Sequence, residues 1–207
     1  MNKEKSKEII NTLRIIIPSP KCELNFNNQF ELLVAVILSA QTTDKRVNEI
    51  TPYLFSKYGK PYELMNANYD DVYNIIKPLG LAKGKAKNII EMSNDLHNKF
   101  NDIVPNTLNE LMSLKGVGRK TASVILAVGF NIPALPVDTH LIRMANRLGY
   151  SKSNDPIKVE NDYKKYINKE DWIDAHHLLL LVGRYHCKAI SPSCDGCLLR
   201  KNCNMKH

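Results

Sequence analysis

The sequence predicts an all-α protein. Apolar residues recur at intervals of three and four along most of the chain, which is the spacing of one helix face. Proline, glycine and capping residues separate these stretches, and no segment alternates polar and apolar residues for long enough to indicate a strand. Apolar residues make up 43% of the 207 positions, enough for a hydrophobic core and against wholesale disorder.

Four helices are expected in the first hundred residues, each marked by an apolar face. The first ends before Pro18, which cannot continue a helix. The second is an apolar run that we expect to be buried, and the third contains Pro52, which works against a regular helix. The expected stretches are 9–16, 30–38, 47–55 and 83–100.

The second half of the chain carries clearer helix ends. Thr107 and Glu110 have the spacing of a capping box, and a helical pattern resumes over 121–128. Asp138 stands at an N-cap position, and Gly149 ends the helix that follows it. Two further helices are expected, one opened by Asp155 and Pro156 and one carrying Trp172, Ala175, Leu178, Leu179 and Val182.

The net charge and the cysteine content indicate which kind of partner the protein binds and in which cellular compartment it works. The net charge is +8, which is the electrostatic footprint of a nucleic-acid partner but also occurs in proteins that are basic for solubility alone. The N-terminal residues MNKEKSKEII do not resemble a secretory signal, and no stretch approaches the roughly 20 apolar residues of a membrane span. We therefore expect a cytoplasmic protein without a membrane partner, whose five cysteines are metal ligands or free thiols.

The segment LMSLKGVGRKTASVIL, residues 111–126, is the central motif. Gly116 and Gly118 bracket Val117 between two helical patterns, which allows a tight turn and a close approach by another backbone. Amides of such a turn and of the next helix form an anion site suited to a DNA phosphate. An ordinary helix–turn–helix corner is the alternative, and the basic charge and the flanking residues favour the phosphate site.

Lys120 and Asp138 are the candidate catalytic residues. Lys120 is expected in the first turn after the hairpin, where the helix dipole favours the neutral amine that a Schiff-base-forming nucleophile needs. The alternative interpretation is that Lys120 is an ordinary solvent-exposed lysine. Asp138 is either an N-cap only or also a carboxylate that helps to deprotonate the lysine and stabilises positive charge on a sugar.

Four cysteines near the C-terminus indicate a metal site. Their pattern is C-x6-C-x2-C-x5-C, and the spacing alone allows either zinc or an iron–sulfur cluster. Cys22 is remote in sequence and is expected to be a packed or free thiol. The four residues of the pattern are Cys187, Cys194, Cys197 and Cys203.

Together these motifs resemble the endonuclease III family of helix-hairpin-helix DNA glycosylases, from about Ile9 to Cys203. The set of GVGRKTA, VDTH and the cysteine spacing, in that order, is highly specific, and LSAQTTD and GRYHC support it. The resemblance implies a six-helix domain (22–132) and an iron–sulfur cluster domain (1–21 and 133–207, cluster loop 187–203), with DNA in the cleft between them. It further implies that the four cysteines hold a [4Fe–4S] cluster rather than zinc.

The resemblance also implies roles for individual residues. Lys120 matches the nucleophile and Asp138 the catalytic aspartate. Gln41 matches the residue that fills the gap left by a flipped base, and Leu81 the wedge that enters the opposite strand. Ser39, Asp44 and His140 match positions near the base pocket, although Asp44 also suits a first helical turn and His140 a hydrogen-bonded core position.

The reaction that the resemblance implies is base excision. A monomer would flip a damaged nucleotide out of duplex DNA, and the lysine amine would attack the sugar and displace the base. β-Elimination at the resulting Schiff base would then break the 3′ phosphodiester. Oxidised pyrimidines and abasic sites are the implied substrates, on chromosomal DNA.

Three positions depart from the family pattern. Ala82 stands where an aromatic residue often follows the wedge, and Val182 stands where a histidine is common. The loop between the first two cluster cysteines reads KAISPS, so Lys188 is its only cation and must carry most of any phosphate contact that the loop makes.

Two other functions remain as alternatives. An adenine glycosylase acting opposite oxidised guanine would carry a glutamate where this chain has Val36, and would lack Lys120. A non-catalytic DNA-binding module with a structural metal would need the hairpin and the cysteines, but not Lys120 and Asp138 together.

Overall fold

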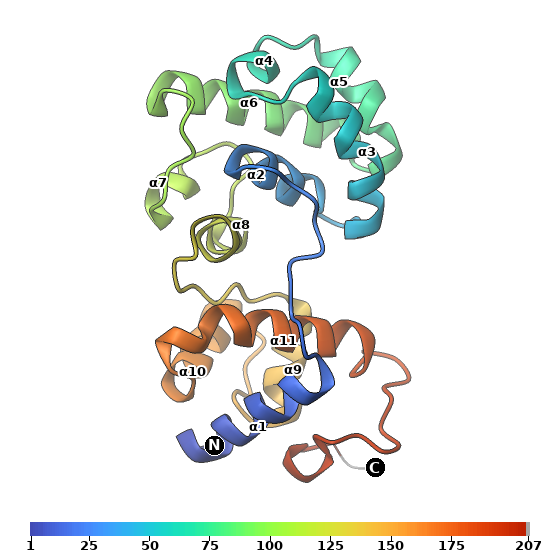
Figure 1. The fold of residues 1–207 in the computed structure, drawn as a ribbon, viewed down its shortest axis with the longest axis vertical. Helices are drawn as coiled ribbons and strands as arrows, with labels where there is room; N and C mark the ends of the chain where they lie inside the picture. Colours follow the sequence, from blue (N-terminus) through green and yellow to red (C-terminus); the bar gives the residue numbers. More distant parts are fainter. Residues whose placement is uncertain (206–207) are drawn as a thin grey trace. The chain divides into compact units, whose positions relative to one another are not determined.

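The computed structural model describes residues 1–205, and all regular elements in that range are helices, which confirms the all-α prediction (Figure 1). Three short 3-10 turns, η1 (Lys77–Leu79), η3 (Lys169–Asp171) and η4 (Arg200–Asn202), and one π-helical segment, η2 (Ile125–Gly129), accompany the α-helices. The α-helices are α1 (Lys3–Ile16), α2 (Gln29–Leu38), α3 (Asp44–Lys57), α4 (Pro61–Met65), α5 (Tyr69–Ile76), α6 (Ala82–Phe100), α7 (Leu108–Met112), α8 (Arg119–Val124), α9 (Thr139–Leu148), α10 (Pro156–Tyr166) and α11 (Trp172–Tyr185).

The chain divides into two compact units. A continuous unit spans Glu23–Ile132, and a discontinuous unit combines Met1–Cys22 with Pro133–His207. Each unit has helices that pack against one another around apolar side chains. Within residues 1–205, no helix combines the length and the hydropathy needed to cross a membrane.

Helix α2 is the centre of the continuous unit. All of its residues from Phe30 to Leu38 are buried, and the helix packs against α3, α6 and α8. Its one buried carboxylate, Glu31, accepts hydrogen bonds from the backbone and side-chain amides of Asn27 at 2.7 and 2.9 Å. Because polar partners satisfy this charge, α2 can be surrounded by other helices, as its apolar sequence predicts.

Helix α11 holds the discontinuous unit together, since it packs against both α9 and α1 (Figure 1). The Tyr163 hydroxyl, fully buried, donates to the backbone oxygen of Leu141 at 2.9 Å. The Tyr150 hydroxyl shares a 2.8 Å hydrogen bond with the Ser6 hydroxyl and so joins α1 to the end of α9. The apolar core between these contacts contains Ile9, Ile10, Leu13, Met144, Leu148, Val159, Leu178, Leu179 and Val182.

The predicted helix ends in the second half of the chain are largely confirmed. Asp138 and Asp155 accept hydrogen bonds from first-turn amides of α9 and α10. Gly149 ends α9 with a φ of +80°, a conformation that favours glycine. Thr107 caps α7, but the Glu110 carboxylate accepts from the Thr107 hydroxyl rather than from its backbone amide, so half of the capping box forms.

The structure adds elements that the pattern did not predict. Helices α4 and α5 fall in a stretch for which we predicted no helix, and both pack against α6. Helix α3 runs through Pro52 without ending there, so this proline does not break the helix. After Val124, the helix expected over 121–128 becomes π-helical.

Candidate nucleic-acid interface and metal centre

The glycine hairpin joins α7 to α8 in the continuous unit. The amide of Val117 donates to the Leu114 oxygen at 3.2 Å, and the amide of Ala122 donates to the Gly118 oxygen at 2.9 Å. The buried Val117 side chain anchors the turn, while Gly116 and Gly118 are exposed. Gly118 is the N-cap of α8 and has no side chain to cap the first-turn amides. The hairpin therefore presents backbone to solvent, as the sequence predicted.

The two glycines differ in what requires them. Gly116 has a φ of +76°, and a Cβ there would lie 3.0 Å from the Asn88 Cβ, so both conformation and packing disfavour a side chain. Gly118 has a φ of −89°, and no atom beyond the adjoining residues lies within 4 Å of the position its Cβ would take. Neither the backbone nor the described neighbours therefore require glycine at Gly118, and its open space suits the close approach of a ligand.

Lys120 is the second residue of α8 and is exposed. Among the described residues of its own unit, none accepts a hydrogen bond from its ammonium group or pairs with it. Lys115, on the other side of the hairpin, instead forms an ion pair with Glu91 at 3.5 Å. The amine of Lys120 is thus accessible to a substrate, at the positive end of a helix dipole.

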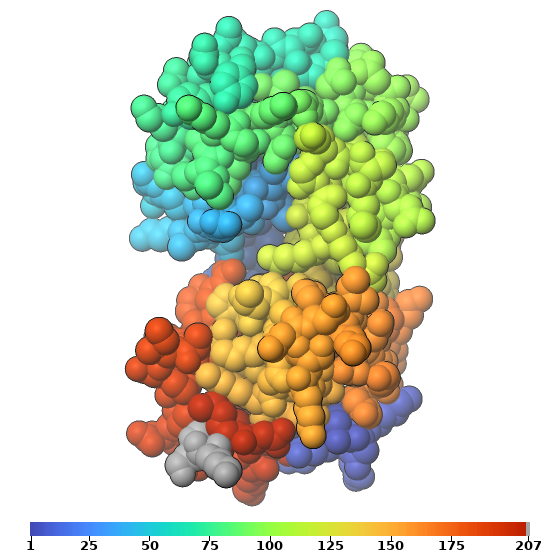
Figure 2. Space-filling view, turned by 180° about the vertical axis from the view of Figure 1, so that it is seen from behind, coloured from blue at the N-terminus to red at the C-terminus, as the bar shows by residue number. Residues whose placement is uncertain are grey.

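Gln41 and Leu81 share an uncommon backbone conformation. Their φ angles are +55° and +50°, in the left-handed region that non-glycine residues seldom occupy. Leu81 is 62% exposed despite its apolar side chain, and Gln41 is also exposed. Such strain is often found where a side chain is held out for a ligand. The two turns touch, because the Thr42 hydroxyl donates to the Leu79 oxygen at 2.5 Å, and Figure 2 shows both segments on one face.

A groove of about 710 Å³ borders the Leu81 turn and the Gly116 side of the hairpin. Three lysines line it: Lys77 and Lys83, which are exposed, and Lys85, which is buried. Ala82, which departs from the family pattern, is buried and is among the residues that line this groove. The structure thus brings the wedge position and the hairpin glycine to one surface of the continuous unit.

The remaining candidates of this unit flank Gln41. Ser39 is the C-cap of α2, and its hydroxyl donates to the Val36 oxygen at 2.8 Å. Asp44 is the first residue of α3, after the N-cap Thr43. It therefore occupies the first-turn position that the helix dipole favours for an acid.

Asp138 and His140 begin α9 in the discontinuous unit. Oδ1 of Asp138 accepts from the amides of His140 and Leu141 at 2.9 and 3.0 Å, while Oδ2 has no described partner within the unit. The His140 Nδ1 lies 3.1 Å from a guanidinium nitrogen of Arg143, which can only donate, so this contact is a hydrogen bond only when Nδ1 carries no proton. Burial lowers the pKa of His140 and favours this neutral ring.

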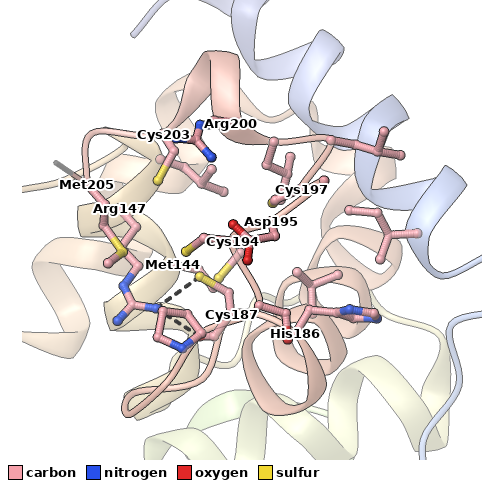
Figure 3. A pocket seen from close by; sticks show the side chains of 18 residues that line it. Met144, Arg147, His186, Cys187, Cys194, Asp195, Cys197, Arg200, Cys203 and Met205 are labelled. Atoms are coloured by element: carbon pink, nitrogen blue, oxygen red, sulfur yellow. Dashed lines mark hydrogen bonds between the residues drawn. The ribbon is translucent and has the colours of Figure 1, made fainter. Parts of the chain in front are cut away.

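The four cysteines line one cavity of about 220 Å³, and their sulfur atoms face a shared space (Figure 3). Cys187 follows α11, and the turn from Cys194 to Cys203 is closed by backbone hydrogen bonds, including Cys197 N to Cys194 O at 3.2 Å. Val182, the second departure from the family pattern, forms part of the apolar wall. Cys22 is half-buried and does not line this cavity.

Arg147 connects α9 to the cysteine segment. One guanidinium nitrogen donates to the Cys187 sulfur at 3.0 Å and to the Lys188 oxygen at 2.8 Å (Figure 3). The side chain of Lys188 itself is exposed. The loop from Lys188 to Ser193 is therefore held through its backbone. The ammonium group of Lys188 has no partner among the described residues.

Sequence reasoning missed Arg147 and a second residue, Lys85, whose ammonium group is buried between the Gln41 and Leu81 turns. For Arg147 a signal exists: Arg143 and Arg147 stand one helical turn apart, behind Asp138, on a helix that precedes the cysteines. For Lys85 we find none, because a lysine near a helix start resembles any surface lysine.

Residues 34–169, more than half of the chain, match the family described as HhH-GPD superfamily base excision DNA repair protein. The fold, the hairpin and this match define a base-excision DNA repair protein. Solved structures agree: a trapped endonuclease III–DNA covalent intermediate with an estranged adenine has a TM-score of 0.94 and 41% identity, covering 99% of this chain and 96% of that one.

The relatives give the family within this class. Endonuclease III of Haemophilus influenzae is 44% identical over 206 residues, covering 100% of this chain and 98% of the relative. Endonuclease III of Escherichia coli K12 is 41% identical over the same length, with the same coverage. The chain belongs to the endonuclease III family, and it is a DNA glycosylase of base-excision repair with abasic-site lyase activity. The predicted family, fold and enzyme class are confirmed.

Proposed function

We propose that this enzyme removes oxidised pyrimidines from duplex DNA and cleaves the resulting abasic site through Lys120. The observation that carries the proposal is an exposed lysine, unpaired within its unit, directly behind a hairpin whose amides suit a phosphate. A relative with 41% identity has been trapped in a covalent intermediate with DNA, which supports a covalent mechanism. We also propose that the enzyme is a monomer and, since the curated relatives named above are bacterial, that it acts on chromosomal DNA in the cytoplasm.

In the proposed reaction, the neutral Lys120 amine attacks the sugar C1′. The bond between C1′ and the base breaks, and its electron pair leaves with the base, which takes up a proton. The sugar ring opens to a protonated Schiff base on Nζ, which acidifies the C2′ hydrogen. Loss of that proton and of the 3′ oxygen breaks the phosphodiester by β-elimination.

Asp138 supplies negative charge to this reaction in our proposal. Its Oδ1 is occupied by two amides of α9, and these bonds fix the orientation of the carboxylate. Its Oδ2 is available to accept a proton or to stabilise positive charge on the sugar. We infer that His140, held neutral, and Ser39 and Asp44 contribute to the pocket for the extruded base.

In this proposal, three features of the protein bind damaged DNA: the hairpin, Gln41 and Leu81. The Gly116–Gly118 hairpin binds a backbone phosphate with its amides, which positions the enzyme without reading sequence. Gln41 fills the gap left by the flipped nucleotide, and Leu81 enters beside the opposite base. Extrusion of the damaged nucleotide is necessary because its C1′ is inaccessible within the stack.

We also propose that Cys187, Cys194, Cys197 and Cys203 hold a [4Fe–4S] cluster. All four sulfur atoms line one cavity with apolar walls, and Arg147 donates to one of them. Among residues 1–205, no three candidate ligands lie close enough together to hold a metal ion, so the support for a cluster comes from the set of four cysteines around one cavity and from membership of the endonuclease III family. When bound, such a cluster supplies structural cross-linking and the capacity for electron transfer.

An adenine glycosylase is the less favoured candidate. The position of its glutamate is occupied by Val36, which is buried in α2 and cannot transfer protons. Lys120, which that branch generally lacks, is present and accessible.

Borohydride trapping tests the proposed nucleophile. Borohydride reduces a Schiff base to a stable amine, so wild-type enzyme and duplex DNA containing thymine glycol should give a covalent adduct. Lys120→Ala should lose both the adduct and strand cleavage while its helical circular dichroism is unchanged. Lys115→Ala, which removes a paired lysine from the same hairpin, should still form the adduct. Undiminished trapping with Lys120→Ala would contradict the assignment.

A further inference from the structure

Two strained turns of the continuous unit meet at one buried ammonium group. Lys85 lies in the first turn of α6 and is only 5% exposed. Its Nζ donates to the Thr42 hydroxyl at 2.7 Å and to the Leu79 oxygen at 3.1 Å. The Thr42 hydroxyl in turn donates to the same Leu79 oxygen at 2.5 Å. Lys85 therefore joins the segment that follows Gln41 to the segment that precedes Leu81.

The charge of Lys85 is unusual for its surroundings. Its described contacts include no carboxylate, so the ammonium is held by two neutral oxygens alone. Burial lowers the pKa of Lys85, which shows that the site disfavours the charged form. A buried cation without a counter-ion does not stabilise a fold as well as an apolar residue of equal size. Stability of the helix packing is therefore a poor reason for a lysine here.

The neighbouring lysines show what Lys85 does not do. Lys83 and Lys87 project from the same helix and are exposed, as expected of residues that meet solvent or phosphate. Lys85 is among the residues that line the groove beside Leu81, but it is only 5% exposed and its Nζ donates to oxygens of the two turns. Hydrogen bonding to the two turns therefore accounts for Lys85 better than direct DNA binding or nucleophilic attack does.

We propose that Lys85 is a positioning residue that fixes the Gln41 turn against the Leu81 turn, so that both side chains enter the duplex in register. This inference rests on the intercalating roles proposed above for Gln41 and Leu81. Both residues have positive φ angles, and such conformations persist only where the surroundings determine them. The Lys85–Thr42–Leu79 hydrogen bonds are the described contacts that determine both turns at once.

The experiment compares duplex with single-stranded abasic DNA. Gln41 and Leu81 act only on a duplex, so a positioning defect should affect duplex cleavage and spare cleavage of a single-stranded abasic site. The variants are Lys85→Met, which keeps the length of the side chain, and Thr42→Val, which removes only the hydroxyl. Lys87→Met removes the same charge from an exposed position of α6 and is the control. Fluorescence of 2-aminopurine placed opposite the abasic site reports entry of the wedge.

We expect Lys85→Met to reduce the duplex cleavage rate by about tenfold, the effect of losing a hydrogen bond to a charged group. The 2-aminopurine signal should fall with it, while the single-strand rate and the Tm stay at or above the wild-type values. Thr42→Val should reproduce the loss, and the double variant should add little, because both remove one network. Lys85→Arg, which keeps the charge and donor groups, should recover most of the duplex rate.

Three outcomes would overturn the inference. Equal loss on duplex and single-stranded DNA would show a general structural role for Lys85. Loss in Gln41→Ala and Leu81→Ala without loss in Lys85→Met would remove Lys85 from the mechanism but leave the intercalating roles intact. No loss in any of these variants, while Lys120→Ala is inactive, would overturn the roles of Gln41 and Leu81 and this inference with them.

Discussion

Asp138 performs two tasks with two oxygen atoms. One oxygen caps α9 by accepting from two backbone amides, and the other has no described partner within its unit. Capping depends on an accepting oxygen, whereas the proposed catalytic task depends on negative charge. These tasks can therefore be separated by a substitution that keeps the oxygen and removes the charge.

Asp138→Asn is the separating variant. Asparagine caps helices about as well as aspartate, so the Tm should change by only a few degrees. Turnover of thymine glycol in duplex DNA should fall by about 100-fold or more, because a positioned charge and proton acceptor are lost. Asp155→Asn makes the same change at the N-cap of α10 and should leave turnover unchanged. Near-normal activity of Asp138→Asn would reduce Asp138 to a cap.

The conformations of individual residues could be predicted where they depend on residues nearby in sequence. Gly116, Gly149 and the capping role of Asp138 follow from preferences that act within a few residues, and the structure confirms them. The positive φ angles of Gln41 and Leu81 do not follow from such preferences, since neither residue favours that region. They are imposed by contacts between distant segments, such as Thr42 with Leu79, which a single sequence does not reveal.

Among the elements, the loop from Lys188 to Ser193 departs most from the family pattern. Its backbone is fixed by Arg147 and by the hydrogen bond from the Ser193 amide to the His186 oxygen at 3.0 Å. Lys188 is the only cation that it carries, and the side chain is exposed. If the loop contacts DNA, this lysine must supply the charge.

Lys188→Ala measures that contribution. Each phosphate neutralised by a cation releases counterions, so log Kd depends on log salt with a slope of about 0.9 per contact. We expect Lys188→Ala to weaken binding to an uncleavable abasic analogue and to lower this slope by about one, with lesion preference unchanged. Lys152→Ala, an exposed lysine in the turn before α10, is the comparison. An unchanged slope would show that the loop makes no phosphate contact.

We predict that the segment from Cys187 to Cys203 depends on its bound cluster to stay folded. Purified protein should be brown and contain about four iron atoms per chain. Removal of the cluster should increase proteolysis within this segment, because the described part of it contains only the short turn η4 as regular structure. Cys194→Ser should do the same and lower the iron content. One zinc and no iron in metal analysis would contradict the cluster.

Prediction of elements depended on the length of the periodic stretch. The long helices α1, α6 and α11 repeat an apolar face over several turns, so the pattern finds them. Helix α4 has five residues and α5 has eight, too few turns for a period to be distinguished from chance. Packing against α6 supplies the stability that their own sequences do not show.

At the scale of the whole molecule, two buried tyrosines link pH to stability. Burial raises the pKa of Tyr150 to about 12, and burial also raises the pKa of the fully buried Tyr163 well above its usual value. Folding favours the neutral phenols, so their contribution to stability is complete below pH 10. It is lost as pH rises from about 10, where the unfolded phenol ionises, towards the folded pKa.

Tyr150→Phe tests this linkage. At pH 8 the variant should be less stable by about 1 kcal/mol, since it lacks the hydrogen bond to Ser6. Between pH 10 and pH 11 wild type should lose up to about 1.4 kcal/mol more than the variant, because phenylalanine cannot ionise. Urea unfolding at pH 8, 10 and 11 measures both effects. Parallel stability curves for the two proteins would rule out a raised pKa for Tyr150.

How much of the site was predictable also depends on scale. The motifs around Lys120, Asp138 and the four cysteines are each local in sequence, and the structure places them in the first turn of α8, at the N-cap of α9 and around one cavity. Lys85 and Arg147 each have a partner about 40 residues away, which the sequence does not reveal. Lys85 carried no recognisable pattern, and for Arg147 the one signal was its spacing from Arg143. Charge likewise predicted a nucleic-acid partner without indicating which surface binds it.

The split of the discontinuous unit has a consequence for how the nascent chain matures. Helix α1 leaves the ribosome well before its partners: Tyr150 lies 144 residues beyond Ser6, and Asp174 lies 160 beyond Arg14. The continuous unit meanwhile has every residue it needs and can fold as it emerges. The apolar face of α1 therefore stays uncovered through most of translation, and an interrupted chain exposes it to chaperones and proteases. Completion of α11 is the event that ends this exposure.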